Sequence, residues 1–506
     1  MSTLAGLIPV TQKASNVCAY CRVRKQGCDR TLPRCQRCAA KGRHCDYTSV
    51  KELPRHEEYE AEPLILHSET CSHSDLSQHG TAELLRAVRE YLNEAVVSMS
   101  STLSELVYNI LGVANVNLET AIVEFGPCIQ QWCPIVPEDL LWGRENDISQ
   151  HSSNRSGLRH PLHLLCLWLV TRRACADEKH LIHCELYQSL KKILALLQTR
   201  CEVDLERLQV GMLIAVYEVG HGLQKQAFQT LATCTAMLRL QDLEARQKED
   251  TNLIQTVEWL KASMLMLDRM IPLSTISNSL PLTILSSDPI SKILSNRLGP
   301  TIPPHSPRPF ASSPRKVHIR TAVALASGHV LEYIHARCHN IEPEEPYDDV
   351  DKIINDCIKM LVDKPQPHTW LHCDAIAMAF CSHILLQASQ MQYLSTILPE
   401  FQLPPDPLYI KAHLALKYSR RMAWDMVRVA IDKIENEAEI PNLPFAGLCA
   451  VLRAGLAVLE TKEYVAEDVI ENIELEGYLR IMRWFSGRWN VSSQYLKKAE
   501  ELLGRY

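Results

Sequence analysis

The chain has little glycine, few aromatic residues and no long hydrophobic run. Only 18 of its 506 residues are glycine and 6% are aromatic, but 46% are hydrophobic, enough for a large core. The longest apolar run, HLLCLWLV (His163–Val170), is far shorter than the roughly 20 residues that span a bilayer. The first residues, MSTLAGLIPVTQK, have no basic segment before their short apolar patch. We therefore expect no membrane span, no secretory signal and a reducing compartment.

Motifs for catalysis are also missing. The sequence has no glycine-rich phosphate loop, no G-x-S-x-G motif and no acidic pair suited to acid–base chemistry. His368 and His372 stand one helical turn apart, but no carboxylate motif accompanies them, and a helix with incidental histidines is the favoured interpretation. An enzyme is the least favoured alternative. A pocket with convergent polar groups would favour it, and an apolar pocket would indicate a small effector ligand.

Cysteine, by contrast, is plentiful and clustered. Two copies of C-x2-C-x6-C contain six of the 19 cysteines: Cys18, Cys21, Cys28, Cys35, Cys38 and Cys45. In a reducing compartment, such a pattern is more often metal-binding than disulfide-bonded. Two tetrahedral zinc ions need eight bonds, which six thiolates supply if two of them bridge both metals. The spacing therefore predicts a binuclear cluster with two Zn²⁺, whose binding would also supply folding energy to a segment with almost no apolar core.

The charge of the chain is divided unevenly. The first 45 residues carry nine Lys and Arg against one acidic residue, Asp29, for a net charge of +8. The whole chain carries −6, so the remaining residues sum to −14. Two zincs and six thiolates add −2, which leaves the metallated segment near +6. A small basic segment on a large acidic remainder indicates that the basic part meets a polyanion such as DNA.

The cysteine-rich stretch resembles the six-cysteine binuclear zinc cluster of fungal transcription regulators, with every cysteine in place. The resemblance implies that Cys18 and Cys35 bridge the two zincs and that the other four cysteines are terminal ligands. It also implies that Arg24 and Lys25 reach the major groove at a CGG triplet, where guanine accepts hydrogen bonds from Arg or Lys. The other basic residues are expected to contact phosphates: Arg22, Arg30, Arg34, Arg37, Lys41 and Arg43.

Three other interpretations of the clustered thiols were open. A disulfide knot is disfavoured by the absent signal, and a redox thiol set is the second possibility. A zinc module that binds protein, without sequence-specific DNA binding of its own, stays as the main alternative. Modules of that ring type use eight ligands, however, and rarely carry so one-sided a charge.

The sequence predicts two folded parts: a small zinc-stabilised α-helical head that binds DNA and a large all-α regulatory domain. Residues 1–17 are expected to be a flexible N-terminus, 18–45 the cluster, 46–80 a linker and 81–506 the helical body. A Pro/Ser-rich loop is expected at 301–316. It contains Ser306 and Ser313, each followed by proline, and phosphorylation there is one possible form of regulation.

Helical periodicity dominates the body. Apolar residues from Leu85 to Ile110 recur at close to 3.6 residues, which predicts one amphipathic helix that packs in the core or dimerises weakly. Further helices are predicted at Leu162–Ala176, His180–Gln198, Asp204–Val219, Gln224–Leu240, Asn252–Asp268, His318–Arg337, Val350–Val362, Thr369–Tyr393, Tyr409–Glu437 and Glu474–Ser486. A second surface loop is expected at Ile341–Asp349.

The body resembles the middle homology domain of fungal transcription factors. The resemblance rests on four short stretches: WCPIVP, YEVGHG (Tyr217–Gly222), LDR (Leu267–Arg269) and WFSGRWNVSSQYL (Trp484–Leu496). The YEVGHG stretch is also similar to regulators of secondary-metabolite gene clusters. We therefore expect a nuclear, sequence-specific regulator of RNA polymerase II genes, not an enzyme. It would bind CGG half-sites in double-stranded DNA as a homodimer and contact the transcription machinery.

Overall fold

The computed structural model describes residues 14, 17–18, 21, 27–32, 34–41, 78–93, 100–136, 161–172, 184–198, 205–277, 280–298, 314–362, 373–397, 406–436, 444–465 and 470–504. The chain divides into two compact units, Met1–Thr70 and Cys71–Tyr506, which we call the head and the body. His368, His372, Ser306 and Ser313 lie outside the described residues.

The head contains one described helix, α2 (Gln36–Ala40). The helices of the body are, in chain order, α3 (Gln78–Asn93), α4 (Ser100–Val113), α5 (Leu118–Phe125), the π-helix η1 (Gly126–Gln130), α7 (Pro161–Thr171), α9 (Glu185–Leu197), α10 (Leu205–Gly220), α11 (Gln224–Gln247), α12 (Thr251–Leu273), α13 (Pro289–Leu298), α14 (Pro314–Cys338), α15 (Tyr347–Val362), α16 (Cys373–Ile397), α17 (Pro407–Asn436), α18 (Phe445–Glu460), α19 (Asn472–Ser486) and α20 (Val491–Leu502). The described part of the body contains no β-strand, so the prediction of an all-helical body is confirmed.

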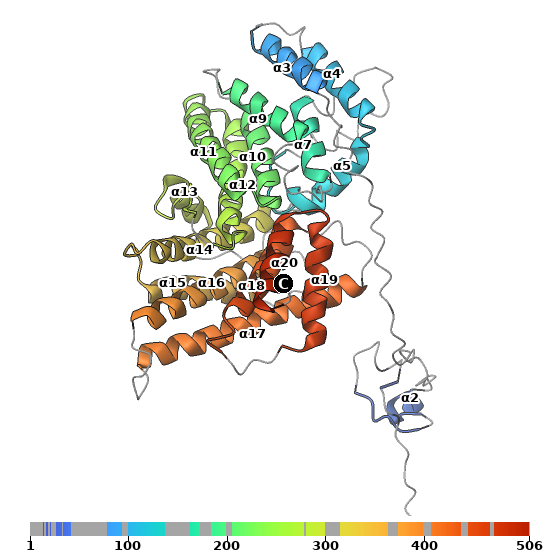
Figure 1. Ribbon diagram of the computed structural model, residues 1–506, viewed down its shortest axis with the longest axis vertical. Helices are drawn as coiled ribbons and strands as arrows, with labels where there is room; N and C mark the ends of the chain where they lie inside the picture. Colours follow the sequence, from blue (N-terminus) through green and yellow to red (C-terminus); the bar gives the residue numbers. More distant parts are fainter. Residues whose placement is uncertain are drawn as a thin grey trace, which may run out of the picture. The chain divides into compact units, whose positions relative to one another are not determined.

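The body is built from two sets of helices joined by α12 (Figure 1). In the first set, α10 packs against α7, α9 and α11. In the second set, α16 packs against α14, α15, α17 and α18. Helix α12 contacts α11, α14 and α18, and one large cluster of buried apolar side chains runs through both sets. The two sets therefore share a core and form one body.

The prediction of one continuous helix from Leu85 to Ile110 is wrong. The segment contains two separate helices, α3 and α4, which pack against each other. Leu84 and Val88 of α3 are fully buried, and α3 also packs against α9. Because this apolar face is covered within the same chain, the structure favours the core-packing alternative for the segment over the dimerising one.

Helix α18 was not predicted from the sequence. Its residues are buried along almost the whole length of the helix. Its sequence, FAGLCAVLRAGLAVLE, is apolar on every side, so it has no helical period to detect. Two glycines permit close contact with neighbouring segments. A Cβ at Gly455 would lie 2.7 Å from the ring of Tyr478, and one at Gly447 would lie 3.0 Å from the backbone of Asp374.

The expected surface loops are shorter than predicted. Helix α14 already begins at Pro314, inside the predicted 301–316 loop, as suits proline in the first turn of a helix. Helix α15 begins at Tyr347, inside the predicted Ile341–Asp349 loop. Among the described residues, no single helix has the length and apolarity to cross a membrane. By these criteria alone, the pair Leu103–Val113 and Leu118–Gln130, bent by 93°, would qualify.

The YEVGHG stretch forms the centre of an aromatic stack. Tyr217 stacks on Tyr187 with ring centroids 5.2 Å apart, and His221 lies 4.3 Å from Tyr217 and 5.6 Å from Trp489. Gly222 lies two residues after the end of α10 and has a φ of +76°, a conformation that glycine adopts without strain. Trp489 belongs to the late WFSGRWN stretch, so two of the four stretches that resemble the middle homology domain contact each other in the core.

We expect Gly220→Ala to destabilise the body by about 1–3 kcal/mol. A Cβ at Gly220 would lie 2.1 Å and 2.3 Å from two ring atoms of Trp489, which is buried and cannot move freely. The matched control is Gly112→Ala in α4, where a Cβ meets nothing within 4 Å and should stabilise the helix by up to about 1 kcal/mol. Urea unfolding midpoints measure both effects, and equal midpoints would contradict this packing.

Stability should fall as the pH drops below about 6.5, because burial and then the charges of Arg172 and Arg488 lower the pKa of His221 to about 3. Between these two pKa values, His221 binds a proton in the unfolded chain but not in the folded one. Its contribution to the free energy of unfolding is therefore complete above pH 6.5 and is lost as the pH falls toward 3. From pH 7 to pH 5 this site should cost about 2 kcal/mol of unfolding free energy. Urea titrations should show that His221→Gln removes this part of the slope. An unchanged slope would contradict the assignment.

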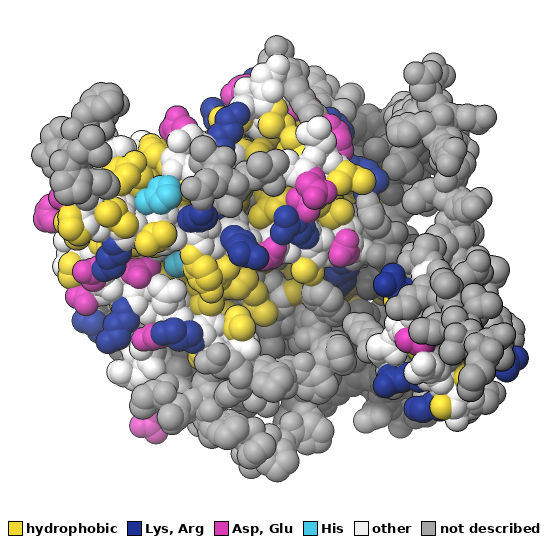
Figure 2. All heavy atoms as spheres, turned by 90° about the horizontal axis from the view of Figure 1, so that it is seen from below, with side chains coloured by type: hydrophobic (Ala, Val, Ile, Leu, Met, Phe, Trp, Pro, Cys, Tyr) yellow, Lys and Arg dark blue, Asp and Glu magenta, His cyan; other side chains and the backbone are white. Residues whose placement is uncertain are grey.

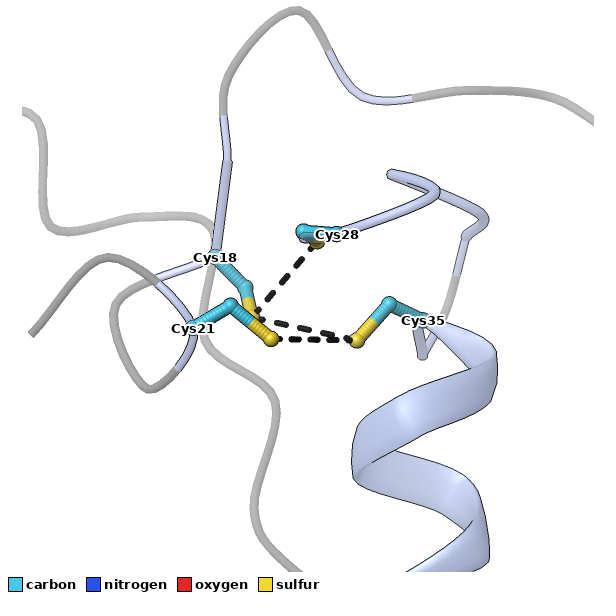
Figure 3. A group of neighbouring side chains, drawn as sticks. All are labelled: Cys18, Cys21, Cys28 and Cys35. Atoms are coloured by element: carbon cyan, nitrogen blue, oxygen red, sulfur yellow. Dashed lines mark hydrogen bonds between the residues drawn. The ribbon is translucent and has the colours of Figure 1, made fainter. Parts of the chain in front are cut away.

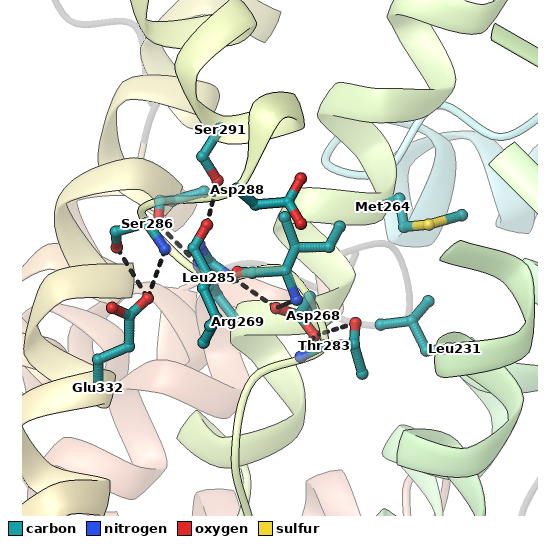
Figure 4. Close-up of polar contacts among 12 residues, drawn as sticks. Leu231, Met264, Asp268, Arg269, Thr283, Leu285, Ser286, Asp288, Ser291 and Glu332 are labelled. Atoms are coloured by element: carbon teal, nitrogen blue, oxygen red, sulfur yellow. Dashed lines mark hydrogen bonds and ion pairs between the residues drawn. The ribbon is translucent and has the colours of Figure 1, made fainter. Parts of the chain in front are cut away.

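The LDR stretch makes a buried ion pair that joins three segments (Figure 4). The guanidinium of Arg269 bonds to the Asp268 carboxylate and donates to the carbonyls of Ile284 at 2.6 Å and Ala324 at 3.1 Å. Asp268 accepts from the backbone N–H and hydroxyl of Thr283 at 2.8 and 2.7 Å. Because both charged side chains are almost fully buried and paired, this stretch fixes the connection between α12, the 280–288 turn and α14.

Candidate zinc centre and nucleic-acid interface

The second C-x2-C pair lies at a helix start, as its spacing predicts. Cys35 is the N-cap of α2, and its Sγ accepts a hydrogen bond from the backbone N–H of Cys38 at 3.4 Å. Cys38 is the buried residue of the first turn, so both thiols face the same side. Asp29, the only acidic residue of the first 45, accepts from the backbone N–H of Gln36 at 3.0 Å. This contact holds the preceding loop against the positive end of α2.

Five of the six predicted ligands converge in the structure. Cys18 Sγ lies 3.9 Å from Cys35 Sγ, 3.7 Å from Cys38 Sγ and 3.9 Å from Cys28 Sγ. Cys21 Sγ lies 3.8 Å from Cys35 Sγ. Figure 3 shows the sulfurs of Cys18, Cys21 and Cys35 turned toward one another, with Cys28 at the side of Cys18. Cys45 lies outside the described residues.

These distances match a zinc–thiolate cluster. Four sulfurs placed about 2.3 Å from one zinc at the corners of a tetrahedron lie about 3.8 Å apart. The sulfur–sulfur distances given above run from 3.7 to 3.9 Å, and the ligand atoms of Cys18, Cys21, Cys28 and Cys35 lie within 4.8 Å of one another. A disulfide would instead need about 2.05 Å. The five thiols are free cysteines, which removes the disulfide-knot interpretation for them.

The thiols differ in how readily they ionise. Burial, together with the hydrogen bonds of Cys35 to the thiols of Cys38, Cys28 and Cys21, raises the pKa of Cys35 to about 12. Burial acts in the same direction at Cys28. There, backbone hydrogen bonds from Cys18 and Arg30 outweigh it and lower the pKa to about 7. A thiol with a pKa near 12 becomes a thiolate at neutral pH only beside a cation, which is the condition that a zinc ion supplies.

The sulfur cluster is also the core of the head. The side chains of Cys18, Cys21, Cys35 and Cys38 have no exposed surface, and only Cys28 is partly exposed. They form a buried cluster of their own that contains no other residue type. A unit whose described interior consists of sulfur has little hydrophobic burial to stabilise it, so its fold depends on the metal.

Part of the predicted DNA-contacting set is visible around this core. Arg30, Arg34, Arg37 and Lys41 are all exposed, and Arg37 lies on α2. Arg30 has a φ of 60°, and its carbonyl accepts from the backbone N–H of Ala14 at 2.7 Å. Outside the described residues lie Arg22, Arg24, Lys25 and Arg43. The described basic side chains are therefore exposed in the unit that contains the sulfur cluster and are accessible to a polyanion.

The sequence interpretation missed the contacts of Asp29. It counted this residue only as the exception in a basic segment, whereas the carboxylate bonds to the Thr31 hydroxyl and to the N–H of Gln36. Spacing gave no signal for it, because Asp29 lies six residues before the N-cap, Cys35, and reaches the helix only through the fold of the loop.

Comparison with known proteins identifies the head. Residues 16–53 match the family described as fungal Zn(2)-Cys(6) binuclear cluster domain. The chain thus carries a binuclear zinc cluster domain of the fungal type, and the six cysteines and two zincs predicted from the spacing agree with it.

A relative from the fungus Botryotinia fuckeliana (strain B05.10), named Transcription factor BOA15, is 32% identical over 103 residues. The match covers 20% of this chain and 54% of that protein, so the chain spans about half the length of this relative. No solved structure matches the chain.

Proposed function

We propose that the protein is a zinc-dependent, sequence-specific DNA-binding regulator of transcription. The observation that carries this proposal is the cluster of thiols at zinc–thiolate spacing with exposed basic residues around it. The head match to a fungal zinc cluster and the similarity to a protein named as a transcription factor support it. A regulator of this kind acts in the nucleus on RNA polymerase II genes.

The resemblance implies which thiols bridge the two zincs, and the arrangement of the thiols supports these roles. Cys18 lies within 3.9 Å of three other sulfurs, and Cys35 lies within hydrogen-bonding distance of several thiols. A thiolate that bridges two metals belongs to two tetrahedra and therefore has more sulfur neighbours than a terminal one. We assign Cys18 and Cys35 as the bridging ligands. Cys21, Cys28, Cys38 and Cys45 are the terminal ones.

The basic residues divide into two roles in this proposal. Arg24 and Lys25 donate to guanine in the major groove of a CGG half-site. Arg22, Arg30, Arg34, Arg37, Lys41 and Arg43 bind phosphates. One head touches about three base pairs, too few for a unique genomic site, so two heads in a homodimer provide the specificity.

The body is proposed to be a middle homology domain that regulates the head and contacts the transcription machinery. The stretches behind this resemblance are core residues in the structure, as Tyr217, Arg269 and Trp489 show. They support the type of fold and carry no information on target genes. A role in secondary metabolism therefore stays a prediction.

Selection of bound DNA from a random pool by the intact protein tests the function. We expect enrichment of CGG triplets that depends on zinc. If the zinc-loaded protein enriches no sequence, the proposal is wrong and the head is a protein-interaction module.

A further inference from the structure

Helix α17 exposes an apolar stripe along its outer face. Ile410, Leu414 and Tyr418 follow one another at four-residue spacing and are 43%, 58% and 62% exposed. Residues four apart lie on the same side of a helix, so these three form one continuous strip. The opposite side of α17 packs against α16, α18 and α19. Helix α17 lies at the lower side of the body in Figure 1, and Figure 2, seen from below, shows groups of hydrophobic side chains bordered by Lys and Arg.

The stripe is relevant to dimerisation because the Leu85–Ile110 segment, for which the sequence left weak dimerisation open, packs within the body. The apolar face of α3 is covered by α4 and α9 of the same chain. The proposed function needs two heads, and this inference rests on that function. Helix α17 offers another surface of the body for a second copy, because it presents three large apolar side chains in one line.

We propose that α17 pairs antiparallel with α17 of a second copy of this chain, about a two-fold axis at Leu414. A two-fold contact requires that a surface be complementary to itself. About this axis Leu414 meets its own counterpart, and Ile410 of each copy meets Tyr418 of the other, because both lie four residues from the centre. The apolar stripe therefore matches itself when one helix is turned around.

The charges at the ends of the stripe fit the same axis. Arg421 lies seven residues after Leu414, and Asp406 lies eight residues before it, so each Arg421 comes within one residue, about 1.5 Å along the helix, of the level of the partner's Asp406. Arg421 is exposed, and no ion pair to it is found within the described part of the chain. One oxygen of Asp406 accepts from the N–H of Leu408 at 2.7 Å and caps the N-terminus of α17. Lys411, which also borders the stripe, already pairs with Asp348 at 2.8 Å.

The size of the contact indicates a weak dimer. Because α17 begins at Pro407, pairing about Leu414 brings only residues 407–421 of the two helices together, a length of about 22 Å at 1.5 Å per residue. A strip about 10 Å wide along that length would bury about 220 Å² per copy, well below the roughly 800 Å² per partner of a stable complex. Two half-sites on one DNA would add to this weak contact by holding the copies at high local concentration.

Sedimentation of the full chain over a range of concentrations tests the proposal. We expect Leu414→Asp to weaken self-association at least tenfold. The matched control is Leu243→Asp on α11, where a leucine of similar exposure (57%, against 58% for Leu414) lies on another helix. A wild-type chain that stays monomeric, or equal effects of the two substitutions, would overturn the inference.

A charge exchange tests the geometry independently. Arg421→Glu and Asp406→Lys should each weaken self-association, because each places like charges together at both ends. An equimolar mixture of the two variants should associate as heterodimers, because both ends then pair opposite charges. Far-UV circular dichroism verifies that Asp406→Lys still folds after losing the cap. Two folded variants that fail to associate when mixed would overturn the antiparallel register.

DNA binding separates this inference from the proposed function. Leu414→Asp should leave binding to a single CGG unchanged and weaken binding to paired sites. If the wild-type chain self-associates through α17 but binds no DNA, the proposed function fails and the dimer surface stands. If paired-site binding is unaffected by Leu414→Asp, the surface assignment is wrong while the function stands.

Discussion

Cys35→Ser is expected to reduce the zinc content from two ions per chain to none. If Cys35 bridges both metals, its loss leaves neither zinc with four sulfur ligands, and the sulfur core of the head comes apart. A structural zinc site contributes on the order of 10 kcal/mol to folding, so the head should unfold when the metal is lost. Zinc analysis of the purified chain, together with native mass spectrometry, measures the stoichiometry.

Two controls distinguish the roles of the cysteines. Cys28→Ser removes a proposed terminal ligand and should leave at least one zinc bound when zinc is in excess. Cys338→Ser removes an exposed cysteine of the body and should leave both ions in place. One zinc in the wild-type chain would contradict the binuclear cluster, and equal losses in the Cys35 and Cys28 variants would contradict the bridging role.

The zinc centre could be predicted from the sequence because ligand spacing is a local property. The C-x2-C pair fixes two thiols on one helical turn, and the structure shows this directly at Cys35 and Cys38. The contact between Asp29 and Gln36 depends on how the loop folds over the helix, which spacing alone does not specify.

The helices of the body were predictable where only one of their faces is buried. Helix α15 has four buried residues on one side, and its period was recognised in the sequence. Helix α18 is buried on all sides, so its sequence carries no period and it was missed. The division of this segment into α3 and α4 was also missed, because the apolar period of α4 continues that of α3.

The sequence alone could not show whether the polar residues of YEVGHG and LDR bind a ligand or are buried in the core. YEVGHG and LDR contain His, Asp and Arg, residue types that often serve in binding sites. In the structure His221 lies between two aromatic rings in tilted contacts, and Arg269 is paired with Asp268 in the core. A buried polar residue and a functional one look alike in sequence, and only the packing around them separates the two.

Arg24→Ala in the full chain should abolish much of the preference for CGG over scrambled DNA. A bidentate contact of Arg to guanine discriminates by about 1–3 kcal/mol, which is a factor of about 5 to 150. Lys25→Ala should act in the same direction. Competition binding with CGG and scrambled duplexes, each at two salt concentrations, separates loss of specificity from loss of affinity.

The matched control is Arg37→Ala, on the exposed side of α2. If Arg37 contacts a phosphate, its removal should weaken binding to both duplexes alike and lower the slope of log affinity against log salt by about 1. Arg24→Ala should change the ratio of the two affinities more than that slope. The assignment would be reversed if Arg37→Ala altered the ratio while Arg24→Ala weakened both duplexes equally. In that case α2, and not the segment after Cys21, would face the base edges.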